Sequence, residues 1–364
     1  MVLYVTKKVA EKLKFPIAPY KPANEFFSWR ANISEDGRDR LLVFMNDASR
    51  YVIVVQKPMA KDFKRIKELF FEALRDALLM EQINPEVINH YISDLGDIYF
   101  FENSGRKETA MLNKACDNAW FAAGRSSSNA WISVFASHLS IGQYSTEDRD
   151  KPSRMFKELL SCYGLPIIKS KAFDLKVKLD LDGNDAIRRL RVPAHITFEQ
   201  LHKILQKAFD WESYHLYCFE LFKEWNENIY AYADVELVKE SEHYDAFETN
   251  PDAKSITGIK LSDYIPEYRK ILYRYDFGDD WRHYIEVENI IEDCQEELPI
   301  LLSGEGDSPP EDVGGSGGYA EFLEIIANPK HEDYDHMKEW SNKRWGAFDY
   351  EKTARYVKSA LWWW

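Results

Sequence analysis

The sequence predicts an α+β protein of two domains, each a mostly antiparallel sheet with packed helices, joined by a helical connector. The chain of 364 residues is longer than a single domain of usual size. Apolar residues make up 45% of it and aromatic residues 15%, which is enough to bury a sizeable core. Strand-like alternation and helix-like periodicity occur in both its N-terminal and its C-terminal parts. We therefore expect domains over residues 1–125 and 171–364, with the connector over 126–170.

The N-terminal domain is expected to contain two strands, two helices and a returning strand, in the order 41–45, 51–55, 63–78, 85–95 and 97–101. The first two runs are rich in strand-forming residues and enclose a four-residue polar loop, which predicts a hairpin. Apolar residues at helical spacing predict the long first helix. Asn84 is suited to cap the second helix, Pro85 to occupy its first turn and Gly96 to end it.

The C-terminal domain is expected to begin with strands and to end with helices. The strands are expected at 173–179, 188–192, 214–222, 230–238, 271–277 and 281–288, and the helices at 198–209, 319–327, 333–341 and 349–361. Thr197 and Gln200 have the spacing of a capping box, which predicts where the first helix begins. Gly278, Asp279 and Asp280 separate the last two strands and predict a hairpin turn.

The charge of the chain is unevenly distributed. The formal net charge is −14 overall, whereas residues 171–364 contain 23 basic and 40 acidic residues, a net charge of −17. Residues 1–125 have a net charge of +2. Because the acidic domain would repel phosphate, we expect nucleic acid to bind, if at all, through residues 1–170.

Neither a membrane nor a disulfide framework is predicted. No stretch approaches the roughly 20 apolar residues of a membrane-spanning helix, and the N-terminal residues do not form a secretory signal. The four cysteines lie far apart and form no C-x-x-C pair, which disfavours a zinc knuckle and paired disulfides. We expect a cytoplasmic protein with reduced thiols.

Three segments of the C-terminal domain contain most of its chemically versatile residues. They span residues 188–217, 273–286 and 309–319, and the last two read YRYDFGDDWRHYIE and PPEDVGGSGGY. Together they resemble the plasmid pRiA4b ORF-3-like family over about residues 171–364. Ile187 stands where that family usually has a tryptophan, and Ser308 where it commonly has a cysteine. The resemblance implies an uncharacterised protein associated with plasmids and mobile elements.

The N-terminal domain has a separate resemblance. The runs FSWRAN, NDASRY and AKDF, which begin at Phe27, Asn46 and Ala60, resemble a small bacterial domain of unknown function. Neither resemblance implies a substrate, so function has to be argued from the chemistry of the residues.

Three histidines are candidate site residues. Alternation along the predicted strand 281–288 places His283 in an apolar row beside Trp281. Two interpretations stay open for it: a core histidine bonded to a carboxylate or carbonyl group, or a ligand or general base whose pKa is tuned by burial. The same two apply to His202, on the apolar face of its predicted helix, and His215 begins a predicted strand.

Carboxylates gather around the predicted turn 276–280. Aspartate is common in turns for structural reasons alone. Together with Glu311 and Asp312, the turn would also suit a hard divalent cation. The mixed set Asp276, His283 and Glu311 would instead suit zinc, manganese or iron. Since no histidine pair has the H-E-x-x-H spacing, the sequence leaves a divalent metal as a candidate cofactor only.

The glycine-rich segment 315–320 fits the dinucleotide pattern G-x-G-x-x-A by its letters. It follows two prolines and two carboxylates rather than a strand, and these carboxylates would repel a pyrophosphate. We therefore expect a glycine-permitted turn into a helix, in a loop able to hold a ligand or a basic peptide.

Two further clusters are candidates for binding. Arg188 and Arg189 begin the dense basic patch of the acidic domain, and either pair with neighbouring carboxylates or capture a phosphate or carboxylate ligand. Trp362, Trp363 and Trp364 cannot all face one core from a single helix. We expect at least one of them to be exposed or in an interface, through self-association or through docking onto the N-terminal domain.

The sequence predicts a binding or interaction module for a basic protein or peptide. Its site is expected to be an acidic cleft formed by His202, His215, Asp276, Asp279, Trp281, His283, Glu311 and Asp312, with Arg188 and Arg189 as further candidates. A metal-dependent hydrolase using the same cleft is the first alternative, and nucleic-acid binding through residues 1–170 is the second. The cleft requires the turn 276–280 and the loop 309–312 to meet in space.

Overall fold

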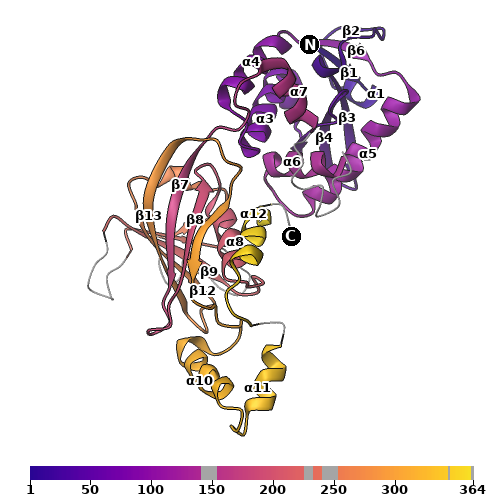
Figure 1. Ribbon diagram of the computed structural model, residues 1–364. Coiled ribbons are helices and arrows are strands. Elements are labelled where there is room, and N and C mark those ends of the chain that lie inside the picture. Colours follow the sequence, from indigo (N-terminus) through magenta and orange to yellow (C-terminus); the bar gives the residue numbers. More distant parts are fainter. Residues whose placement is uncertain (141–153, 225–232, 240–252, 343–344, 362–364) are drawn as a thin grey trace. The chain divides into compact units, whose positions relative to one another are not determined.

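The computed structural model describes residues 1–140, 154–224, 233–239, 253–342 and 345–361 (Figure 1). Contacts divide the chain into two compact units, one ending at Lys169 and the next beginning at Ser170. Each unit contains its own sheet together with helices. The expected α+β class and two-domain organisation are therefore confirmed. Within the described residues, no helix is both long enough and apolar enough to cross a membrane.

The first unit contains a sheet with the strand order β2-β6-β1-β3-β4-β5. Its strands are β1 Val2–Val5, β2 Ile17–Ala18, β3 Ser28–Asp36, β4 Asp39–Asn46, β5 Val52–Gln56 and β6 Tyr99–Glu102. The expected hairpin is the antiparallel pair β4–β5, and β3 pairs antiparallel with β4. However, β1 is parallel to β3 and β6, and β2 is parallel to β6. This sheet is mixed rather than mostly antiparallel, because helices or long connections join those strands.

The first unit also contains helices, most of which come after β5 in the chain (Figure 1). They are α1 Lys7–Ala10, α2 Ala60–Lys64, α3 Ile66–Met80, α4 Pro85–Leu95, α5 Arg106–Ala123, α6 Asn129–Ser140 and α7 Arg154–Tyr163, with a 3₁₀ turn at Glu25–Phe27. The helix expected over 63–78 is divided between α2 and α3. As expected, the Asn84 side chain caps α4 by accepting a hydrogen bond from the Glu86 N–H, and Gly96 ends it at φ +55°.

Helix α6, which lies in the segment expected to connect the domains, packs on the edge strand β5. The hydroxyl oxygen of Ser137 accepts a hydrogen bond from the Val52 N–H at 2.7 Å, and that of Ser133 from the Val54 N–H at 2.8 Å. Asn129 Oδ1 accepts a third bond, at 3.0 Å, from the end of β5. Residues four apart share one face of a helix, so α6 satisfies alternate N–H groups of β5 in place of another strand.

The second unit contains a sheet with the strand order β11-β10-β9-β12-β13-β7-β8-β14. Its strands are β7 Ser170–Leu179, β8 Ala186–Pro193, β9 Tyr217–Phe222, β10 Val235–Val238, β11 Lys254–Ser255, β12 Lys270–Tyr275, β13 Trp281–Cys294 and β14 Ile300–Glu305. Among these described strands every neighbouring pair except β10–β11 is antiparallel, as expected for this domain.

The helices of the second unit are α8 Phe198–Ala208, α10 Gly315–Ala327, α11 Tyr334–Ser341 and α12 Tyr350–Ser359, with a 3₁₀ turn at Leu261–Asp263. Helix α8 begins with the expected capping box of Thr197 and Gln200. Helices α8 and α12 contact each other, and α10 contacts α11 (Figure 1). Along β13 the predicted alternation is confirmed, since Trp281 and His283 are buried whereas Arg282 is exposed.

Candidate functional site

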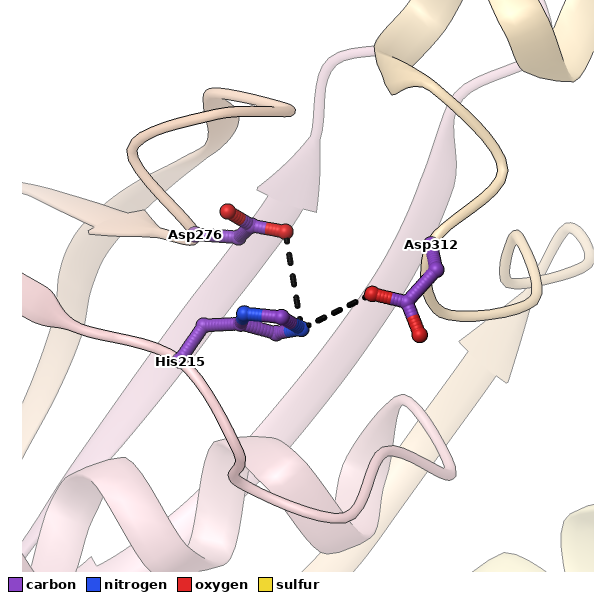
Figure 2. A group of neighbouring side chains, drawn as sticks. All are labelled: His215, Asp276 and Asp312. Atoms are coloured by element: carbon purple, nitrogen blue, oxygen red, sulfur yellow. Dashed lines mark hydrogen bonds and ion pairs between the residues drawn. The ribbon is translucent and has the colours of Figure 1, made fainter.

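The turn between β12 and β13 and the loop preceding α10 meet at one end of the second sheet (Figure 2). The Asp279 carboxylate accepts a hydrogen bond from the Gly314 N–H at 3.1 Å. The two backbones approach so closely that a Cβ atom on Gly315 would lie 2.8 Å from the Asp279 carbonyl oxygen. The indole N–H of Trp211, in the loop before β9, donates to the Pro309 carbonyl oxygen at 2.9 Å. Three segments that are distant in the sequence therefore meet here.

His215, Asp276 and Asp312 form one cluster at this meeting point, with the imidazole between the two carboxylates (Figure 2). Nε2 of His215 lies 3.0 Å from Asp312 Oδ1 and 3.7 Å from Asp276 Oδ2. One potential ligand atom from each residue lies within 4.8 Å of the other two. Asp312 is exposed and the other two are half-buried, so the cluster is reached from solvent.

Left-handed backbone conformations position both carboxylates. Asp276 has φ +56° and Asp312 has φ +62°, values that aspartate tolerates better than most residues. Asp276 Oδ1 accepts a hydrogen bond from the Gly278 N–H at 3.0 Å. This bond fixes the carboxylate while its other oxygen faces His215.

Glu311 lies in the same loop but is engaged by its own partners. The Tyr275 hydroxyl donates to Glu311 Oε1, and the Glu212 N–H donates to Glu311 Oε2 at 2.8 Å. Tyr275 Oη in turn accepts a hydrogen bond from the Tyr214 N–H at 3.1 Å. Burial, reinforced by the Glu311 carboxylate, raises the pKa of Tyr275 above its ordinary value. Glu311 therefore fastens the loop to β12 and to the segment before β9.

Sequence reasoning did not single out Tyr275 and Glu212 as functional. No local motif marks them, because their partner Glu311 is distant in the sequence. Only the adjacency of aromatic and acidic residues in the run WESYH, which begins at Trp211, is visible in the sequence.

The structure places His283 and Trp281 in the core rather than at the cluster. His283 is 0% exposed, and its Nδ1 lies 3.3 Å from the Tyr273 carbonyl oxygen. Burial lowers the pKa of His283 to about 3, so the ring is neutral near pH 7. The metal set of Asp276, His283 and Glu311 is thus not assembled, because β13 turns His283 inward. Its place beside Asp276 is taken by His215.

His202 is also buried, within a hydrogen-bonded network. Its Nδ1 lies 2.6 Å from Tyr273 Oη and its Nε2 lies 2.6 Å from Ser213 Oγ. The ring stacks on Tyr217 with a centroid separation of 3.7 Å and an interplanar angle of 3°. Burial lowers the pKa of His202 well below its ordinary value. Ser213, which sequence reasoning overlooked, is the exposed end of this network.

The two arginine candidates lie away from the cluster and differ from each other. Arg188 is 1% exposed and donates to backbone carbonyl oxygens, including that of Glu305 at 2.7 Å and that of Ala208 at 3.0 Å. Burial lowers its pKa to about 10. Arg189 forms a partly exposed ion pair with Glu288 at 3.2 Å. Arg188 is therefore hydrogen-bonded to carbonyl oxygens rather than to a carboxylate among the described residues, and capture of a ligand by it stays a prediction.

The remaining candidate, the tryptophan run Trp362, Trp363 and Trp364, lies outside the described residues. Self-association through this run therefore stays a prediction.

Both domains resemble known families. Residues 171–355 match the plasmid pRiA4b ORF-3-like protein family, and residues 2–148 match a domain of unknown function, DUF6933. The uncharacterised protein y4hQ of Sinorhizobium fredii is 35% identical over 188 residues, which cover 50% of this chain and 84% of that protein. A solved protein of unknown function from Methanosarcina mazei Go1 is 33% identical, and the match covers 50% of this chain and 96% of that one with a TM-score of 0.41. The chain belongs to the plasmid pRiA4b ORF-3-like family, as its C-terminal segments indicated.

Proposed function

We propose that the second unit is a binding module whose site is the cluster of His215, Asp276 and Asp312 and whose ligand is a divalent cation. The observation that supports this is the spacing of the ligand atoms. Two ligand atoms bound at about 2.1 Å and separated by 90–110° lie about 3.0–3.4 Å apart. The separations of 3.0 and 3.7 Å from His215 Nε2 are close to that range. Small side-chain movements therefore suffice for coordination.

The ligand atoms also restrict which cation fits. One imidazole nitrogen with two carboxylate oxygens suits zinc, manganese or iron better than calcium, which prefers oxygen ligands alone. Three protein ligands leave coordination positions for water, so a metal-dependent hydrolase at this cluster is the second candidate function. A bound water whose pKa is lowered by the cation would be its nucleophile.

A basic protein or peptide is the alternative ligand of the same carboxylates. The net charge of −17 over residues 171–364 favours a cationic partner, and Asp312 is exposed to one. The two ligands differ in their response to ions. Binding of a basic peptide weakens as salt screens the charges, whereas coordination of a metal is much less sensitive to salt.

The test is a calorimetric titration of chelator-treated protein with Mn²⁺ and with Zn²⁺, accompanied by elemental analysis. We expect one cation per chain and at least a tenfold loss of affinity in His215→Ala, because one of three ligands is removed. The control Glu324→Gln removes an exposed carboxylate from α10 and should bind normally. Absence of a stoichiometric cation, or equal effects of the two substitutions, would refute the proposal. Salt-sensitive binding of a polylysine peptide that requires Asp312 would then favour the basic partner.

A further inference from the structure

A second arrangement of polar side chains lies in the loop before β9, separate from the ligands of the cluster. Ser213 is exposed, and its Oγ lies 2.6 Å from Nε2 of His202, which is 3% exposed. On the other side of the imidazole, Nδ1 lies 2.6 Å from the hydroxyl of Tyr273, which is 0% exposed. A serine, an imidazole and a phenol thus form a continuous hydrogen-bonded row from the surface to the core. A nucleophile, its base and an orienting group have this order.

We propose that Ser213 is a nucleophilic serine that is activated by His202, positioned through Tyr273, and accepts an acyl group from an uncharged activated ester. In the first step Ser213 Oγ bonds to the ester carbonyl carbon while its proton moves to His202 Nε2. The bond between that carbon and the leaving oxygen then breaks. The leaving oxygen takes the proton from His202 and departs as an alcohol, so the step needs no other reactant.

The imidazole is held in the state and the orientation that this step requires. Burial lowers the pKa of His202, so the ring is neutral near pH 7 with a nitrogen lone pair available, and once protonated it readily gives its proton to the leaving oxygen. The parallel stack on Tyr217, with ring centroids 3.7 Å apart, fixes the plane of the imidazole. The base therefore does not have to reorient before it accepts the proton.

The backbone of Ser213 is also unusual. Its φ is +67°, in the left-handed region that non-glycine residues seldom occupy and that is costly for a residue without an amide or carboxylate side chain. The fold maintains this conformation, which directs Oγ toward His202 while the residue stays exposed. Strained backbone of this kind is common at reactive residues.

The orientation of the Gln206 side-chain amide determines which groups donate and which accept along the hydrogen-bonded row of Ser213, His202 and Tyr273. Its side-chain amide lies 3.0 Å from Tyr273 Oη when the nitrogen faces the phenol, and Oε1 is then buried with no hydrogen-bond partner among the described residues. With the amide turned, its oxygen accepts the phenol proton and Tyr273 accepts from His202 Nδ1–H. Nε2 of His202 then carries no proton and can accept the proton of Ser213. The proposal requires this orientation, since the reverse one makes Nε2 a donor to Ser213.

Charge indicates the class of substrate. The surrounding domain has a net charge of −17, and Glu212 lies next to Ser213 in the loop. A phosphoryl donor, which is anionic, would be repelled, whereas an uncharged ester approaches without this penalty. Acyl transfer is therefore favoured over phosphoryl transfer.

The experiment uses the full chain in the presence of chelator, so that its outcome does not depend on cation binding at His215. The protein is incubated with p-nitrophenyl acetate, and acetylated residues are located by peptide mass spectrometry. We expect Ser213 to be acetylated about 100-fold faster than Ser262, an exposed serine of the same unit that serves as internal reference. Ser213→Ala should abolish the fast reaction. Equal acetylation of the two serines would overturn the proposal.

Two matched variants test the positioning role of Tyr273. Tyr273→Phe removes the hydroxyl that contacts His202 Nδ1, whereas Tyr356→Phe removes the hydroxyl of an exposed tyrosine on α12 of the same unit. We expect about a tenfold slower acetylation in the first and an unchanged rate in the second, with melting temperatures recorded for both. Equal rates, or rates that only follow the melting temperature, would refute the role of Tyr273.

Discussion

His215 Nε2 lies 3.0 Å from Asp312 Oδ1, although 97 positions separate the two residues in the chain. The contact exists because the loop preceding α10 is fastened to the end of the sheet. Asp279 holds this loop at Gly314, and Tyr275 holds it at Glu311. The effects of substitutions that loosen the attachment of this loop should therefore be separable from the effects of substitutions that remove a ligand atom.

Asp312→Asn should weaken cation binding without unfolding the protein. Because Asp312 is exposed, its hydrogen bond with His215 contributes less than about 1 kcal/mol to stability. A cation that binds the native state raises the melting temperature, so we expect Mn²⁺ to stabilise the wild type and to have little effect on Asp312→Asn. A variant that keeps the full thermal shift would exclude Asp312 as a ligand.

Gly315→Ala should destabilise the loop, whereas Gly317→Ala should not. A Cβ at residue 315 would lie 2.8 Å from the Asp279 carbonyl oxygen, in a backbone with φ +69°, while nothing lies within 4 Å of one at residue 317. We expect a loss of about 1–3 kcal/mol for the first change and a gain of about 0.5–1 kcal/mol for the second. Urea unfolding would measure both, and equal effects would contradict the close approach.

Replacement of Arg188 by methionine should cost far more stability than replacement of Arg189 by glutamine. The first change removes the donor to one buried and two partly buried carbonyl oxygens, and it removes a cation–π contact of 3.9 Å to Phe348, so we expect a loss of about 3 kcal/mol. The second change breaks a partly exposed ion pair, so we expect it to reduce the stability by less than about 1 kcal/mol. Similar unfolding midpoints for the two variants would show that the hydrogen bonds of Arg188 to the carbonyl oxygens add little to the stability.

Acidification should destabilise the second unit through its buried histidines. His283 binds a proton near pH 3 in the folded state but near pH 6.5 in the unfolded chain. Between these values the unfolded state binds more protons, so the free energy of unfolding falls as pH falls, by up to about 1.4 kcal/mol per pH unit for each such group. The lowered pKa of His202 acts in the same direction.

His283→Phe should reduce this dependence between about pH 6 and pH 4, because one of the two groups is removed. The control His336→Gln changes an exposed histidine and should retain the wild-type dependence. Urea midpoints at several pH values would give the comparison. An unchanged dependence in His283→Phe would show that His283 does not contribute.

Ser133→Ala and Ser137→Ala should each destabilise the first unit. Each removes the acceptor of a buried β5 N–H, at 2.8 and 2.7 Å, and leaves that donor unsatisfied. We expect a loss of about 1–3 kcal/mol for each. Ser127→Ala changes an exposed serine before α6 and is the control. Amide exchange at Val52 and Val54 should accelerate in the first two variants only.

The sequence by itself determined the class of the fold, most helices and strands, and the family. These features depend on local information: a capping box at Thr197, the alternation along β13, and turn residues at 278–280 are each read within a few positions. It also supplied His215, Asp276 and Asp312 as candidates, because imidazoles and carboxylates are recognisable wherever they occur.

Only the tertiary structure decided which candidates meet. Alternation showed that His283 lies in an apolar row, but it could not show that packing leaves the ring fully buried while His215 stays accessible. The parallel pairing of β1 with β3 and β6, and the contact of Ser213 with His202, were equally inaccessible to sequence reasoning. The physical reason is the same in each case: side-chain identity and periodicity are local, whereas a site is formed by long-range contacts that depend on the packing of the whole domain.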